Sequence, residues 1–144
     1  MTGRVGLSKH IPGLSTLVQL LQWRASTHPQ QIAFTFLPDG EAVEVKLSYG
    51  ELDRGARAIG AVLQAKGARG DRALLLYPTG VEYITAFFGC LYAGRIAVPA
   101  YPPRLNRNLH RLQAMVADAH PSVALTTSQT LSRLKRALLK FSED

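Results

Sequence analysis

Residues 72–98 read RALLLYPTGVEYITAFFGCLYAGRIAV, and this stretch decides the fold class. Its first part, Ala73 to Tyr77, is a continuous apolar run of strand length, which is typical of a strand covered on both faces. Pro78-Thr79-Gly80 then supplies a turn. Val81 to Ala93 is apolar nearly all round and predicts a buried helix, which Gly94 ends. Ile96 to Val98 predicts a second short, buried strand.

The same alternation continues toward the C-terminus. Pro99, Pro102 and Pro103 predict a stiff extended crossing, and a second amphipathic helix follows, closed by His120-Pro121. The apolar positions of that helix are Leu109, Leu112, Val116 and Ala119. Val123 to Leu125 predicts a third strand, followed by a basic helix that carries Leu131, Leu134 and Leu138. Strands that alternate with helices over short connections predict parallel βαβαβ units, and therefore an α/β fold.

The N-terminal part of the sequence does not continue the pattern of alternating strands and helices. We expect residues 1–13 to be a flexible leader, and Ser15 to cap a helix that ends at His28-Pro29. The apolar positions Leu14, Leu17, Val18, Leu21 and Ala25 keep helical spacing. The runs Ile32–Leu37 and Val43–Leu47 predict a β-hairpin, because Pro38-Asp39-Gly40 between them is turn chemistry.

The segment Ser48-Tyr49-Gly50-Glu51 predicts the start of a helix. It is a capping box, in which the serine hydroxyl accepts from a free amide and the glutamate returns a bond to the serine backbone. An apolar stripe at Leu52, Ala56, Ile59, Val62 and Leu63 follows it. Gly67 is placed to close this helix in a left-handed conformation.

Composition narrows the class of protein. The chain has 144 residues, of which 47% are hydrophobic and 19% charged, as expected for one globular domain. No run is apolar enough for a membrane span and no secretion signal is visible, so we expect a cytoplasmic protein. The net charge of +7 is concentrated in residues 95–144. Those charges are spread over predicted helix faces without interleaved Phe or Trp, so we expect no nucleic-acid partner.

Residues with catalytic chemistry do not form a recognisable site. The strand-to-helix turn at Tyr77–Gly80 has one glycine and no lysine, unlike a phosphate-binding loop. The four histidines, His10, His28, His110 and His120, lack metal-ligand spacing. Cys90 lies in an apolar context, and the cluster Ser122, Thr126, Thr127 and Ser128 has the character of a helix cap. We therefore predict no catalytic, cofactor-binding or metal-binding residue in this chain.

Two segments resemble a known family. Leu47-Ser48-Tyr49-Gly50-Glu51-Leu52 resembles the first core motif of the adenylate-forming (AMP-dependent) ligase superfamily, and Leu91-Tyr92-Ala93-Gly94-Arg95-Ile96-Ala97-Val98-Pro99 resembles the second. Details are similar to the fatty acyl-AMP ligase branch, above all Pro99-Ala100-Tyr101-Pro102-Pro103. The resemblance runs from about Leu14 to Thr127.

The resemblance implies a reaction in which ATP, with Mg²⁺, activates a fatty acid to an acyl-adenylate for transfer to an acyl carrier protein. The family's phosphate loop, nucleotide-contacting motifs and catalytic lysine lie further along the chain than this sequence extends. We therefore expect residues 14–144 to be an incomplete N-terminal part of an AMP-binding domain, inactive alone and partnered by the remainder of the ligase. The alternatives are a non-catalytic binding or assembly module that keeps the fold, or the N-terminus of an acyl-CoA synthetase or a peptide-synthetase adenylation domain.

Overall fold

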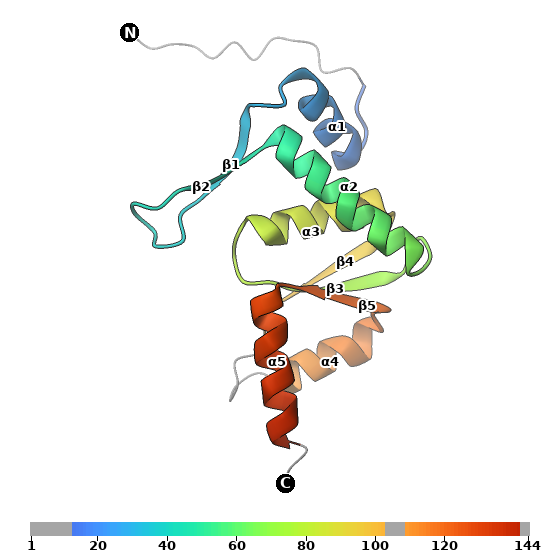
Figure 1. Cartoon of the computed structure of the whole chain (residues 1–144). Helices are drawn as coiled ribbons and strands as arrows, with labels where there is room; N and C mark the ends of the chain where they lie inside the picture. Colours follow the sequence, from blue (N-terminus) through green and yellow to red (C-terminus); the bar gives the residue numbers. More distant parts are fainter. Residues whose placement is uncertain (1–12, 103–108, 142–144) are drawn as a thin grey trace.

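The computed structural model describes residues 13–102 and 109–141 (Figure 1). Nearly all of the predicted leader, and Pro103 of the predicted crossing, lie outside these residues. The elements are α1 (Leu17–Thr27), β1 (Ile32–Phe36), β2 (Val45–Ser48), α2 (Tyr49–Ala65), β3 (Arg72–Leu76), α3 (Val81–Tyr92), β4 (Ile96–Ala100), α4 (Leu109–Ala119), β5 (Val123–Thr126) and α5 (Ser128–Phe141).

The parallel βαβαβ prediction is confirmed. The central strand β3 pairs in parallel with both β4 and β5, so that Leu74 lies opposite Val98 on one side and Ala124 on the other. The sheet order β4-β3-β5 means that the chain crosses back over β3 between its second and third strands. Right-handed crossovers then put successive helices on opposite faces of the sheet. Figure 1 shows α2 and α3 on one face and α4 and α5 on the other.

The main core lies between the sheet and the α2–α3 pair. Ala73 and Leu75 of β3 are fully buried there, together with Leu63 of α2 and Ala86 and Cys90 of α3. Because successive strand residues point to opposite faces, Leu74 and Leu76 turn toward α4 and α5, and they are also buried. The apolar run of β3 is therefore covered on both faces of the sheet, as predicted.

The hairpin prediction is confirmed in type and corrected in length. β1 and β2 pair antiparallel, with Phe36 opposite Val45. The second strand begins at Val45 and not at Val43, because the Asp39 carboxylate accepts hydrogen bonds from the backbone N–H groups of Glu41, Ala42 and Val43. Those bonds fold residues 39–43 into a loop of their own. The strand β4 also differs from expectation, since it runs through Pro99 to Ala100 at an edge of the sheet.

The helix starts are set by local hydrogen bonds. The capping box is confirmed, because the Glu51 N–H donates to Ser48 Oγ (3.2 Å) and the Ser48 N–H donates to Glu51 Oε2 (2.8 Å). The cap of α1 is Thr16 and not Ser15. A capping oxygen accepts from the amide three residues on, and it is Thr16 Oγ1 that receives the Gln19 N–H at 3.1 Å.

The prediction for Gly67 is wrong in its physical reason. The helix α2 ends at Ala65, the left-handed glycines nearby are Gly70 and Gly94, and Gly67 is not one of them. A Cβ at Gly67 would lie 2.2 Å from Nη2 of Arg95. The position needs a glycine because a guanidinium fills the space that a side chain would take.

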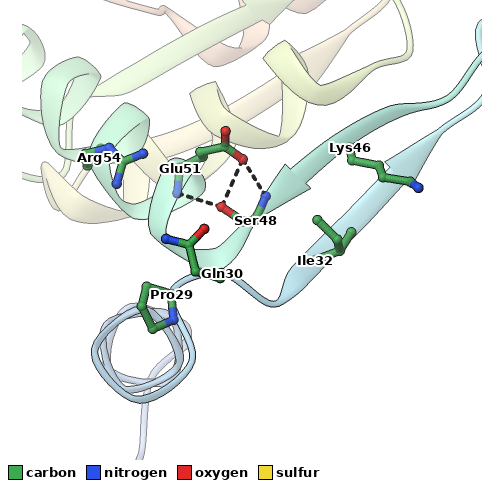
Figure 2. Close-up of a pocket in the computed structure, with 7 residues that line it drawn as sticks. All are labelled: Pro29, Gln30, Ile32, Lys46, Ser48, Glu51 and Arg54. Carbon is green, nitrogen blue, oxygen red and sulfur yellow. Dashed lines mark hydrogen bonds between the residues drawn. The ribbon is translucent and has the colours of Figure 1, made fainter.

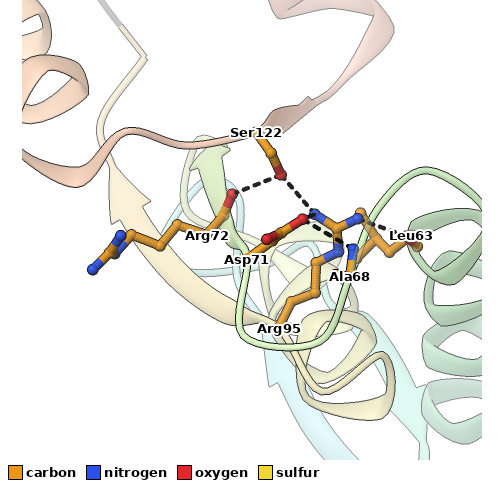
Figure 3. Close-up of polar contacts among 6 residues, drawn as sticks. All are labelled: Leu63, Ala68, Asp71, Arg72, Arg95 and Ser122. Atoms are coloured by element: carbon orange, nitrogen blue, oxygen red, sulfur yellow. Dashed lines mark hydrogen bonds and ion pairs between the residues drawn. The ribbon is translucent and has the colours of Figure 1, made fainter.

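That guanidinium is the centre of a buried polar network (Figure 3). Arg95, 3% exposed, donates from Nη2 to the Leu63 carbonyl and from Nη1 to Ser122 Oγ, both at 2.8 Å. Its Nη1 also lies 3.7 Å from the carboxylate of Asp71, which itself accepts the Ala68 N–H. The network joins the last turn of α2, the entry to β3, the entry to β4 and the entry to β5.

Substituting Arg95→Lys should lower the free energy of unfolding by about 2–4 kcal/mol, because an ammonium cannot make both forked hydrogen bonds and leaves buried acceptors unpaired. Thermal and urea denaturation measure this. The matched control is Arg54→Lys on the exposed face of α2, which should stay within about 0.5 kcal/mol of the parent chain. Equal stability of the two variants would contradict the structural role given to Arg95.

Burial raises the pKa of the Cys90 thiol to about 11. Below its unfolded pKa of about 9 the thiol is protonated in both states, so this group leaves stability unchanged there. Between pH 9 and 11 the unfolded chain loses the proton first, and stability falls. Cys90→Ala should therefore show a shallower loss of stability over that interval, and the native thiol should resist a disulfide reagent at pH 8 until denaturant is added. Rapid labelling of the folded chain at pH 8 would rule this out.

Candidate functional site

Parallel sheets bind ligands beyond the carboxyl ends of their strands, so this edge is where a site is expected. A hollow of about 270 Å³ lies there. It is lined by Tyr77, Pro78, Thr79 and Tyr83 after β3, and by Pro99, Ala100 and Tyr101 at the end of β4. Among the described residues no charged side chain lines it, and burial raises the pKa of the Tyr77 phenol. The hollow can accept an apolar surface, and its lining offers no group ready to act as a general base at neutral pH.

The turn that forms one wall of this hollow leads into α3. Gly80 precedes the helix without a side-chain cap, and Glu82 lies in its first turn. A carboxylate there already complements the positive end of the helix dipole, which disfavours a bound phosphate. These features support the interpretation of Tyr77–Gly80 as a structural turn.

A second, polar hollow of about 300 Å³ surrounds the capping box (Figure 2). Pro29, Gln30, Ile32, Lys46, Ser48, Glu51 and Arg54 line it. The backbone N–H and the hydroxyl of Ser48 both donate to Glu51, and these bonds hold the pKa of its carboxyl below the usual range. A carboxylate stabilised in this way is a weak base that is committed to the start of α2. The hollow is therefore a by-product of the cap.

The serine and threonine cluster serves the backbone. Thr127 Oγ1 accepts the Thr130 N–H at 3.1 Å and so starts α5, which confirms the helix-cap prediction at that residue. Thr126 Oγ1 donates to the Leu76 carbonyl at 2.6 Å, and Ser122 binds Arg95. The hydroxyls of Ser122, Thr126 and Thr127 thus each have a structural partner.

The two family motifs meet in space. The first motif starts α2 and the second ends α3, and these helices pack against each other along their length. Asp53, just after the first motif, accepts a hydrogen bond from the hydroxyl of Tyr92 in the second. Arg57 stacks over the Tyr92 ring and donates to Asp53 at 2.8 Å. Burial is the main cause that raises the pKa of Tyr92, and the hydrogen bond to Asp53 adds to it. The contact holds the two helices together.

Sequence reasoning missed the role of Arg95. Its partners lie 32 and 27 residues away along the chain, at Leu63 and Ser122. The available signal was a single charged residue between the helix-ending Gly94 and a buried strand. Such a charge must find partners, because an unpaired buried charge is costly.

The described residues form neither a metal-binding cluster nor a membrane-spanning helix. Among residues 13–102 and 109–141, no three side chains of the types His, Cys, Asp and Glu gather closely enough to hold a metal ion. His28 and His120 lie at the ends of α1 and α4, while His10 lies outside these ranges. None of the helices in the described part of the chain is long and apolar enough to cross a membrane.

Comparison with known proteins identifies the fold. Residues 21–143 match the family model of AMP-binding enzymes. A medium-chain-fatty-acid–[acyl-carrier-protein] ligase of Moorena producens is 48% identical over 92% of this chain and 23% of its own length. A long-chain-fatty-acid–AMP ligase of Mycolicibacterium smegmatis is 34% identical over 91% of this chain and 21% of its own.

Solved structures agree with these relatives. The crystal structure of a fatty acid AMP ligase from Legionella pneumophila superposes with a TM-score of 0.76 and 41% identity, over 81% of this chain and 20% of that one. The chain thus spans about a fifth of the length of the proteins that it matches, and it corresponds to an N-terminal part of them. The chain belongs to the family of AMP-binding enzymes, and within it to the branch of the fatty acyl-AMP ligases.

Proposed function

We propose that this chain is the N-terminal scaffold of a ligase that activates a fatty acid with ATP. The observation that carries the proposal is the 48% identity to a fatty-acid ligase across 92% of the chain. The geometry supports a scaffolding role, because both motifs are used in helix packing and none of the described residues that line the hollow at the strand ends is charged.

In the proposed reaction, a fatty acid carboxylate oxygen attacks the α-phosphate of ATP, and the acyl-adenylate and pyrophosphate are formed. The acyl group then passes to the thiol of an acyl carrier protein, and AMP leaves. Bound Mg²⁺ would offset the charge of the phosphates. The residues described here supply none of these reacting groups. Their part is to hold β3, β4 and β5 in register, so that the carboxyl edge of the sheet faces the rest of the enzyme. We infer a cytoplasmic location, where ATP is available.

A chimera tests the proposal. This chain replaces the matching segment of the Moorena producens ligase, and fatty-acid-dependent ATP–pyrophosphate exchange is measured. We expect exchange within about tenfold of the parent ligase, a loss of at most about 1.4 kcal/mol of transition-state stabilisation, because scaffold residues act through positioning alone. The chain by itself should give no exchange above background.

The control for this experiment is the Moorena producens ligase from which the segment has been deleted, which should be inactive. A chimera that folds and binds ATP, yet shows no exchange with any fatty acid, would contradict the proposed function. Exchange by the isolated chain would contradict the view that it carries no reactive group.

A further inference from the structure

Exposed apolar side chains gather on the hairpin. Five large ones lie on β1, β2 and the loop between them: Ile32, Phe34, Leu37, Val43 and Val45. We call them the hairpin surface. Within the described residues β1 and β2 pair only with each other, so each keeps an edge of unpaired backbone groups. A two-stranded ribbon with apolar faces is marginal in water, and its edges are templates for another strand.

A second region is also incompletely covered. The helices α4 and α5 are amphipathic, yet none of residues 110–119 is buried, and of residues 128–136 only Thr130 is. Val116 and Leu131 are exposed, as is Ala124 of β5. In the described part of the chain, β5 has a neighbour on one side only. We call α4, α5 and β5 the outer layer. An apolar helix stripe is stable only when another element covers it.

The opposite face of the sheet is complete. Leu63, Leu75 and Cys90 are fully buried between β3 and the α2–α3 pair. Exposed apolar side chains elsewhere are single ones, such as Leu17 on α1 and Val62 on α2, and the edge strand β4 has Ile96 exposed at its start and Tyr101 just after its end. The hairpin surface and the outer layer are the regions where they gather over more than one element, and these two regions lie on different sides of the molecule (Figure 1). One short peptide or one added helix could not cover both. The missing partner must be large, or must reach the chain at two places.

The charges on α5 indicate which kind of partner fits the outer layer. The helix α5 has no acidic residue, and Arg133, Lys135 and Arg136 are exposed on it. Two copies of the chain, each with a net charge of +7, would bring these cations together if their outer layers met. A partner with apolar side chains framed by carboxylates fits the outer layer better than a second copy does.

We propose that the hairpin surface and the outer layer are the two docking surfaces for the remaining part of the ligase. This rests on the proposed function and assigns the surfaces through which it is assembled. The matched relatives are about five times as long as this chain, so they carry enough additional structure to cover both regions. The occupant adds backbone pairing at a free strand edge and places apolar side chains against Leu131, with carboxylates beside the cations of α5.

The test is assembly from two chains. The Moorena producens ligase without the segment that matches this chain is produced separately and mixed with the full chain, and complex formation is measured by light scattering and titration calorimetry. Val43→Lys probes the hairpin surface and Leu131→Lys the outer layer. Their controls are Val62→Lys on α2 and Leu17→Lys on α1. The exposures of Val43 and Val62 are 55% and 51%, and those of Leu131 and Leu17 are 43% and 52%.

We expect a one-to-one complex that each probe substitution weakens about tenfold or more, while each control stays within about twofold. All four positions are exposed, so the isolated variants should keep the parent circular dichroism spectrum. In the chimera, the probe substitutions should lower the melting temperature and the controls should not.

A complex that forms equally well with all four variants would overturn the docking surfaces and leave the proposed function intact. A homodimer of this chain that Val43→Lys or Leu131→Lys disrupts would assign the surface to a second copy, and so would overturn the proposal. The absence of any complex, together with an active chimera whose stability ignores the probe substitutions, would overturn it as well. An inactive but folded chimera would instead count against the proposed function.

Discussion

One buried cation organises the structure. The guanidinium of Arg95 binds the carbonyl of Leu63 and the hydroxyl of Ser122, with Asp71 alongside. A charge in this position is costly unless its hydrogen bonds are made, so the segments that supply its partners are held to one arrangement. Those segments are the end of α2 and the entries to β3, β4 and β5. Even the absence of a side chain at Gly67 follows from this requirement.

The two family motifs take their meaning from the same arrangement. One starts α2 through a capping box, and the other stops α3 at Gly94 and then places Arg95 beneath the end of α2. The hydrogen bond between Asp53 and Tyr92 closes the other side of this helix pair. The motifs therefore hold helices and strands in register. By holding the strands in register, they also fix the carboxyl edge of the sheet, where ligands bind in such folds.

Local patterns predicted those elements that local physics decides. The capping box, the helix stop at Gly94 and the buried run of β3 depend on neighbours a few residues away, and all three were visible in the sequence. The role of Arg95 was not, because its partners come together only after the βαβ units have folded. The same long-range contact explains the mistaken reading of Gly67. The choice of Thr16 over Ser15 was a matter of register, which periodicity fixes only to within a residue or two.

Burial differs between two parts of this chain, the α2–α3 face on one hand and the hairpin with the outer layer on the other. The α2–α3 face has the close packing of a finished core, and the Arg95 network at its end makes hydrogen bonds through both terminal nitrogens of the guanidinium, while its Nε is buried without a partner. The hairpin and the outer layer carry apolar side chains that water still reaches. A partner that binds only the folded form stabilises it in proportion to the logarithm of its concentration over its dissociation constant. In this chain that contribution falls on the two open regions, the hairpin surface and the outer layer, more than on the covered α2–α3 face. In the assembly that we propose, covering of these surfaces by the rest of the ligase is the step that completes the packing of β1, β2, α4 and α5.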